Sequence, residues 1–386
     1  MDNLQKRRAF LKTLTLGSIG ATAPIRLLRA EEISDADKIT NDPLSHDPEI
    51  KRKYNGPYKN NFLNRVAFPI GGLGAGMFCL EGTGAISHMS VQNKPEVFNE
   101  PAMFAAVTVR GLKNGAKVLE GQVPEWKYFG RRGSGNGLAG STLGLPRFKT
   151  AECTTRFPYS TIRLSDNELP LQVRITGWSP FIPTDEDNSS LPVGALEYRF
   201  VNSGKEKLEA VFSYNSKNFL AADEHEANAI EKMVNGFILT RKGTEVNPFL
   251  QVNFAIFTHD DHTVVDHCWF RGGWWDPLTM AWNNIREGRV QAVDPVEKDA
   301  GGASLFVPFS LLPGASKTIR VMMAWYVPES DLHIGTALPD EKKNCDPESG
   351  CCAGPSDLGV TIGKHNPSPN YKPWYSSVFK PRSPKF

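Results

Sequence analysis

Short stretches of apolar, β-branched and aromatic residues recur along most of the chain. Turn-forming Gly, Pro, Asn and Asp residues separate them. Nine stretches have the length and character of strands: 103–110, 159–164, 171–175, 195–202, 208–214, 236–241, 250–258, 303–308 and 317–327. This pattern predicts an all-β fold, a large two-sheet antiparallel β-sandwich with few short helices and an extended C-terminal connector.

Two tight turns and two helices are expected between these strands. Residues 201–205 (Val-Asn-Ser-Gly-Lys) carry an Asn and a Gly, which favours a hairpin, and residues 312–315 (Leu-Pro-Gly-Ala) predict another before the last strand. The helices are expected at 223–234 and 278–287.

The first 30 residues have the features of a twin-arginine export signal. Arg7 and Arg8 precede Phe-Leu-Lys and a weakly apolar segment at 13–25, the pattern read by the twin-arginine pathway. This segment is shorter and more polar than a membrane span of about 20 apolar residues. We therefore expect export to the periplasm or the extracellular space, without stable membrane insertion.

Changes in composition predict the remaining boundaries. Residues 31–60 are polar and charged, which indicates a linker, and residues 61–328 hold the expected strands of the sandwich. Residues 329–386 are rich in proline and poor in apolar runs, as in an extended connector.

Charge excludes one class of function. The 44 Lys and Arg residues nearly balance the 42 Asp and Glu residues, leaving a formal charge of +2. Because bulk positive charge drives non-specific binding to nucleic acid, we expect no nucleic-acid partner.

The glycine-rich run 71–76 does not have the spacing of a nucleotide-binding loop. Starting at Gly72 or Gly74, the sixth position of G-x-G-x-x-G falls on Met77 or Cys79. A glycine-rich strand or bulge packed closely against another backbone is the better interpretation, and no cofactor is expected.

Histidine and acidic residues cluster at 259–268, where His259, His262 and His267 lie near Asp and Cys residues. A loop of this composition could bind zinc, and a metal-dependent hydrolase is one alternative hypothesis. No second set of ligands follows at a recognised spacing. A solvated turn is therefore favoured, and no metal site is expected.

Four of the eight tryptophans fall within fourteen residues: Trp269, Trp274, Trp275 and Trp282, with Asp276 among them. Indole rings stack on sugars, so a free-standing carbohydrate-binding module is a second alternative. Packing of these indoles against the sheet or a neighbouring domain is the favoured interpretation.

No catalytic residue can be chosen from the sequence. A glycosidase needs two carboxylates at a set separation, and no Glu or Asp stands out by its context. A G-x-S-x-G elbow and a Cys–His nucleophile pair are also absent from the sequence.

An ordered set of motifs resembles the N-terminal domain of glycoside hydrolase family 116, which includes non-lysosomal glucosylceramidases and bacterial β-glucosidases. The similar segments are 68–77, 82–87, 93–95, 269–282, 313–328 and 371–375.

The resemblance implies a non-catalytic β-sandwich domain. In that family both catalytic carboxylates, a Glu nucleophile and an Asp acid/base, belong to a following (α/α)6 helical toroid. The sequence given stops where that toroid would begin, and prolines at 381 and 384 do not favour its first helix. We therefore expect a chain lacking the catalytic domain, whose partner is a helical catalytic domain encoded separately or lost, and possibly carbohydrate.

Overall fold

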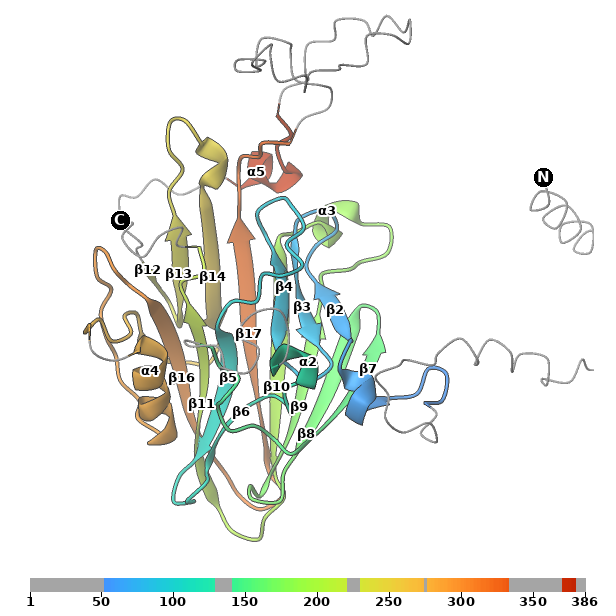
Figure 1. The fold of residues 1–386 in the computed structure, drawn as a ribbon, viewed down its shortest axis with the longest axis vertical. Helices are drawn as coiled ribbons and strands as arrows, with labels where there is room; N and C mark the ends of the chain where they lie inside the picture. The colour runs from blue at the N-terminus through green and yellow to red at the C-terminus, as the bar shows by residue number, and fades with distance from the viewer. Residues whose placement is uncertain (1–51, 129–140, 221–229, 274–275, 333–369, 380–386) are drawn as a thin grey trace, which may run out of the picture. The chain divides into compact units, whose positions relative to one another are not determined.

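The structure is a computed structural model that describes residues 52–128, 141–220, 230–273, 276–332 and 370–379. These residues form the predicted all-β sandwich, with three antiparallel sheets and few short helices (Figure 1).

The first layer of the sandwich is a nine-stranded sheet. Its strands, in spatial order, are β1 (Tyr58–Lys59), β7 (Thr150–Arg156), β8 (Tyr159–Ser165), β9 (Leu171–Trp178), β10 (Val193–Asn202), β17 (Ser316–Tyr326), β14 (Val252–Thr258), β13 (Gly236–Arg241) and β12 (Ile230–Met233). Strand β1 lies within the last residues of the expected linker and pairs with β7.

The second layer is divided between two sheets rather than the single one expected. The five-stranded sheet contains β15 (Val264–Asp266), β16 (Gly302–Leu311), β11 (Leu208–Lys217), β5 (Met103–Val109) and β6 (Ala116–Val118). The three-stranded sheet contains β2 (Ala67–Ile70), β3 (Met77–Glu81) and β4 (Ile86–Ser90).

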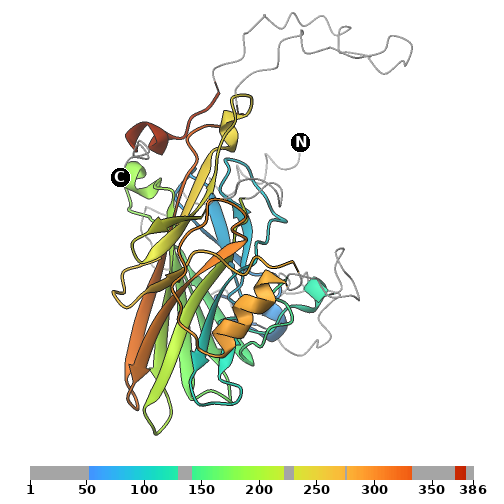
Figure 2. The same ribbon diagram turned by 90° about the vertical axis from the view of Figure 1, so that its left-hand side faces the viewer.

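Helices occupy connections between strands, apart from α5, which follows the last strand. They are α2 (Glu125–Tyr128), α3 (Glu186–Ser189), α4 (Pro277–Arg286) and α5 (Trp374–Val378), with 3-10 turns η2 (Asn60–Leu63) and η3 (Pro248–Leu250). Helix α4 lies against the five-stranded sheet (Figure 2) and confirms the helix predicted at 278–287. None of the described helices is long and apolar enough to cross a membrane.

Aromatic side chains join the two layers. Tyr198 and Phe200 of β10 point inward and meet Phe212 of β11 at ring-centroid distances of 5.0 and 5.9 Å. All are buried in one apolar cluster that runs through the three sheets. Alternation of apolar and polar residues along β8, β9 and β10 places the opposite face of the nine-stranded sheet in solvent.

Small residues let the three-stranded sheet approach the nine-stranded one. A Cβ atom added at Gly177 would lie 2.5 Å from Cδ1 of Ile70, and one added at Gly194 would lie 2.5 Å from its Cγ2. The run 71–76 makes a similar approach in the turn between β2 and β3, since a Cβ atom at Gly72 would lie 2.1 Å from the Leu191 carbonyl oxygen. The close-packing interpretation is confirmed, although the run forms a turn rather than a strand.

The predicted hairpins are wrong, although all nine predicted strands are confirmed. Residues 201–205 leave β10 in the nine-stranded sheet and enter β11 in the five-stranded sheet, and residues 312–315 connect β16 to β17 in the reverse direction. Both turns therefore cross between layers.

Asn202 holds these two crossings side by side. Its Nδ2 atom donates to the carbonyl oxygens of Glu206, at 2.8 Å, and Leu311, at 3.0 Å. Its backbone N–H donates to Ala315, and its carbonyl accepts from Gly314. Asn and Gly thus stabilise two turns that cross between layers rather than hairpins within one sheet, because these residues favour any tight turn.

The helix predicted at 223–234 is also wrong where it can be compared. Ile230–Met233 is strand β12, which pairs with β13 at the edge of the nine-stranded sheet. Pairing with an exposed strand edge overrides the helical preference of this short segment. Residues 223–229 lie outside the described residues.

Candidate functional site

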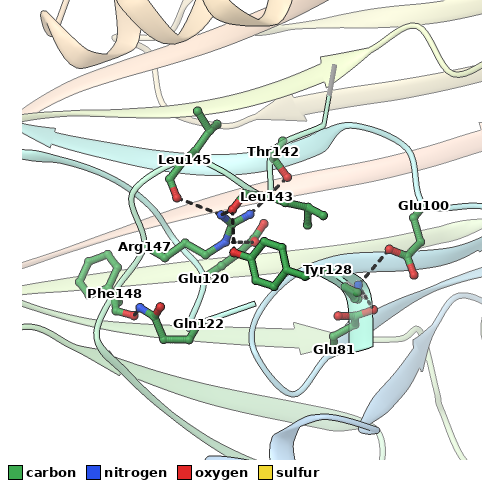
Figure 3. A network of polar contacts seen from close by, with 11 residues as sticks. Glu81, Glu100, Glu120, Gln122, Tyr128, Thr142, Leu143, Leu145, Arg147 and Phe148 are labelled. Carbon is green, nitrogen blue, oxygen red and sulfur yellow. Dashed lines mark hydrogen bonds and ion pairs between the residues drawn. The ribbon is translucent and has the colours of Figure 1, made fainter. Parts of the chain in front are cut away.

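Charged side chains are buried where α2 packs against β3 (Figure 3). The Lys127 Nζ atom lies 2.7 Å from Oε1 of Glu81 and 2.9 Å from Oε2 of Glu100. Burial raises the pKa of the Glu81 carboxyl, while the two carboxylates raise the pKa of Lys127 despite its own burial. The ammonium group therefore stays charged and ties α2 to the three-stranded sheet.

A second buried ion pair lies beside the first. The Arg147 Nε atom donates to Oε2 of Glu120 at 3.0 Å, and its Nη1 atom donates to the carbonyl oxygens of Leu143 and Leu145 at 3.0 and 2.9 Å. Its Nη2 atom donates to the Thr142 hydroxyl at 3.3 Å. One guanidinium thus fixes the segment 142–147 against Glu120, two residues after β6 (Figure 3).

These carboxylates do not form a glycosidase pair. A general acid needs a raised pKa, which Glu81 has, but it must also reach a substrate. Glu81 and Glu120 are each only 6% exposed, and each is occupied by a buried cation. Both groups position segments of the chain. The sequence feature that could have identified Glu81 as a buried charge is its position directly after the apolar run Phe-Cys-Leu.

A third buried ion pair connects the two layers. Lys117 of β6 lies 2.7 Å from Oδ2 of Asp166, which follows β8, and 2.7 Å from Glu168. Burial acts to raise the pKa of Asp166, but Lys117 and the backbone N–H groups of Glu168 and Lys149 lower it below its usual value.

We expect Asp166→Asn to cost about 2 kcal/mol of unfolding free energy at pH 7, the scale of a hydrogen bond to a charged group. Because the folded-state pKa of Asp166 is lowered, its contribution is present above the unfolded value of 3.8 and is lost as the pH falls through the folded value. Urea unfolding at pH 7 and pH 3 measures this. The exposed Asp261→Asn is the control, and a deficit for Asp166→Asn that does not shrink at pH 3 would contradict the assignment.

The structure separates the tryptophans singled out in the sequence. Trp269 and Trp282 are 4% and 8% exposed and pack α4 onto the five-stranded sheet. The Trp269 Nε1 atom donates to the Ser304 hydroxyl at 2.8 Å. Asp276 caps the N-terminus of α4 by accepting from the Thr279 N–H at 3.0 Å. These side chains hold the helix in place, and the two buried indoles present no face to a sugar.

The histidines do not converge on a metal site. His267 is buried, and its Nδ1 atom lies 2.9 Å from the Val293 carbonyl oxygen, whereas His259 and His262 are exposed. Asp260 forms an ion pair with Lys317. Among the described residues, no group of three or more His, Cys, Asp or Glu side chains is placed to hold a metal ion. The structure therefore gives no support to a metal-dependent hydrolase.

Several residues named from the sequence lie outside the described residues. These are Arg7 and Arg8 of the expected export signal and the adjacent Trp274 and Trp275.

Helix α5 forms an aromatic surface at the end of β17. Its Tyr375 is 1% exposed, and the hydroxyl accepts from the Val327 N–H at 3.3 Å and donates to the Val327 carbonyl at 3.2 Å. Around this anchor, Tyr371, Trp374, Val378 and Phe379 are exposed. We call these four residues the C-terminal surface.

The loop between β4 and β5 lies at the same end of the sandwich as the C-terminal surface (Figure 1). Asn93 Nδ2 donates to the Glu329 carbonyl oxygen at 3.2 Å, and Lys372 Nζ lies 2.8 Å from the Glu329 carboxylate. The loop that holds Asn93 also carries Phe98, which is 87% exposed. Because exposed apolar patches mark interaction sites, this end of the molecule is the strongest candidate for binding a partner.

Comparison with known families identifies the type of domain. Residues 67–385 match the model of a family described as beta-glucosidase 2, glycosyl-hydrolase family 116 N-term. No curated protein matches the sequence.

Solved structures add only weak likenesses. A putative kojibiose phosphorylase from the human microbiome is 8% identical over 70% of this chain and 25% of its own, with a TM-score of 0.32. A polysaccharide lyase is 10% identical over 70% of this chain and 32% of its own, with a TM-score of 0.27. This chain thus spans a quarter to a third of those proteins, and neither likeness bears on fold or activity. The family match covers most of the sequence, and the chain therefore belongs to the N-terminal domain family of glycoside hydrolase family 116.

Proposed function

We propose that this chain is a non-catalytic docking domain that binds a helical catalytic domain of family 116 through its C-terminal surface. The observation that carries the proposal is the anchoring of α5. Tyr375 is fixed against Val327, and three aromatic side chains around it stay exposed. An anchored helix that holds apolar groups in solvent is preorganised for a protein contact.

The docking surface differs from the one suggested by the tryptophan cluster. Trp269 and Trp282 are used to pack α4, so they are unavailable to a partner. Tyr326, on the outer face of β17, lies 6.1 Å from the Tyr375 ring between centroids and extends the C-terminal surface onto the sheet. This moves the proposed contact from the α4 side of the sandwich to the end of β17.

Export and family activity complete the proposal. Arg7 and Arg8 would direct the folded domain through the twin-arginine pathway to the periplasm or the extracellular space. Hydrolysis of β-glucosides or glucosylceramide would belong to the partner domain. Residues 61–328 would form the sandwich and residues 329–386 the connector towards that partner.

The experiment combines the full chain with a family 116 helical catalytic domain from the same organism, produced as a separate chain. We expect a complex in isothermal titration calorimetry, and no hydrolysis of aryl β-glucosides by the chain alone. Trp374→Asp should weaken binding about tenfold or more, as when an aromatic anchor is removed from an interface. Trp126→Asp is the matched control, since Trp126 is also partly exposed but lies in α2.

Two results would overturn the proposal. One is substantial glucoside turnover by the purified chain. The other is the absence of a complex, or a complex whose affinity Trp374→Asp leaves unchanged.

A further inference from the structure

Three arginines lie side by side on the solvent face of the nine-stranded sheet. In the strand register Arg163 of β8 is opposite Arg174 of β9, which is opposite Arg199 of β10. All three are exposed, while their neighbours along the strands, such as Val173 and Phe200, are buried in the core. The register and the alternation together place three guanidinium groups on one face.

This arrangement is unfavourable in the isolated domain. Residues directly opposite on neighbouring strands have Cβ atoms about 4.5–5.5 Å apart, and like charges at such positions destabilise a sheet. Arg163 has a carboxylate partner, Glu152, at 3.5 Å. Within the part of the chain that the structure describes, neither Arg174 nor Arg199 is in an ion pair. Glu197, on the same face two residues from Arg199, is already paired with Arg320, which leaves Arg174 and Arg199 free to pair with an anionic ligand.

Aromatic rings lie on the same face, four residues along the strands from the arginines. Tyr159 is opposite Trp178, and Tyr159 is 53% exposed. Nearby, Phe157 and Phe181 are also exposed and their rings meet edge to face at 4.9 Å. Four strand residues span about 14 Å, so the rings and guanidiniums lie within reach of one short oligomer.

Hydroxyl groups fill the space between the rings and the arginines. Thr161 of β8 is opposite Thr176 of β9, midway between the two rows. Aromatic, hydroxyl and guanidinium groups therefore follow one another along the exposed face of β8 and β9. We call this set the arginine face: Tyr159, Thr161, Arg163, Arg174, Thr176, Trp178 and Arg199.

We propose that the arginine face binds an acidic polysaccharide, a chain of sugar rings that carry carboxylates. The rings would stack on Tyr159 and Trp178, because flat aromatic groups contact the apolar faces of sugars. Arginine forms paired hydrogen bonds with carboxylates, which suits Arg174 and Arg199. Arg199 is opposite Thr318 on β17, eight residues and about 27 Å from Tyr326, so the arginine end of this site is distinct from the C-terminal surface. The aromatic end is nearer, since Trp178 aligns through Ala195 with Met322, four residues from Tyr326.

Three polymers test the proposal with the full chain. Polygalacturonate has both rings and carboxylates, its fully methyl-esterified form keeps the rings without the charge, and polyglutamate keeps the charge without the rings. We expect binding to polygalacturonate that weakens as salt is raised, and weaker binding to both other polymers.

Variants then assign the site. Arg174→Gln with Arg199→Gln should weaken polygalacturonate binding about tenfold or more, the loss expected for charge-assisted hydrogen bonds to a carboxylate. Tyr159→Ala should weaken it as well. Arg286→Gln is the matched control, because Arg286 is exposed on α4 in the other layer. The double variant should unfold at the same temperature as the parent chain or a higher one, since a like-charge contact is relieved.

The outcomes separate the alternatives. Absence of polygalacturonate binding at low salt overturns the proposal, as does equal binding of polyglutamate. Loss of catalytic-domain binding in the double arginine variant, with polygalacturonate binding unchanged, would make the arginine face a protein interface and also overturn it. Failure of the docking experiment at Trp374 has no bearing on these results.

Discussion

Arg147→Met is expected to destabilise the domain by about 3–5 kcal/mol, the cost of removing one partner from a buried ion pair. The substitution leaves the Glu120 carboxylate, 6% exposed, without its cation. It also removes the donors to the Leu143 and Leu145 carbonyl oxygens. Urea unfolding at pH 7 measures the change in unfolding free energy.

Two comparisons isolate the electrostatic part of this loss. Arg289→Met removes an exposed partner of Glu287 and should cost under about 1 kcal/mol. The double variant Glu120→Leu, Arg147→Met loses the same carbonyl contacts as the single variant but has no unpaired carboxylate. It should therefore be more stable than Arg147→Met alone. A deficit for Arg147→Met no larger than that of Arg289→Met at pH 7 would show that the Glu120–Arg147 pair does not stabilise the segment.

The strands of the fold could be predicted from the sequence because their signal is local. The alternation of apolar and polar residues in Leu171–Trp178 and Val193–Asn202 indicates that one face of each strand is buried and the other faces solvent. Short strands were missed where this alternation fails. In β6 every residue is buried and there are only three of them, so periodicity cannot mark it, whereas the longer, fully buried β5 was predicted from its apolar run.

The assignment of strands to sheets could not be predicted, because it depends on contacts far apart in the sequence. Asn202 has the chemistry of a hairpin turn, yet its Nδ2 atom reaches Leu311, 109 residues away. A tight turn within one sheet and a corner between two sheets use the same residues. Strand β12 was missed for a related reason, since only the edge of β13 makes its residues extended.

The candidate sites were only partly visible in the sequence for the same reason. The segment 371–375 was noted as part of the family resemblance, and the structure shows which of its rings is the buried anchor. Arg163, Arg174 and Arg199 are single residues on three strands, and only the register makes them neighbours. The near-neutral net charge conceals this local concentration of positive charge.

Trp269→Ala is expected to cost about 3–5 kcal/mol of unfolding free energy, as for other buried aromatic side chains replaced by alanine. The Trp269 ring packs directly on Gly302, where an added Cβ atom would be 2.5 Å from its Cε3 atom, and Gly302 has no side chain to move into the space that the ring leaves. Its loss leaves a cavity between α4 and the five-stranded sheet and removes the donor to Ser304.

Trp126→Ala is the matched control for this substitution, because Trp126 is 44% exposed. It should cost much less, since its ring already contacts water. Urea unfolding monitored by far-ultraviolet circular dichroism compares the two without relying on tryptophan fluorescence. A Trp269→Ala variant as stable as Trp126→Ala would show that the indole does not hold α4, and would return Trp269 to the set of residues available to a sugar or a partner domain.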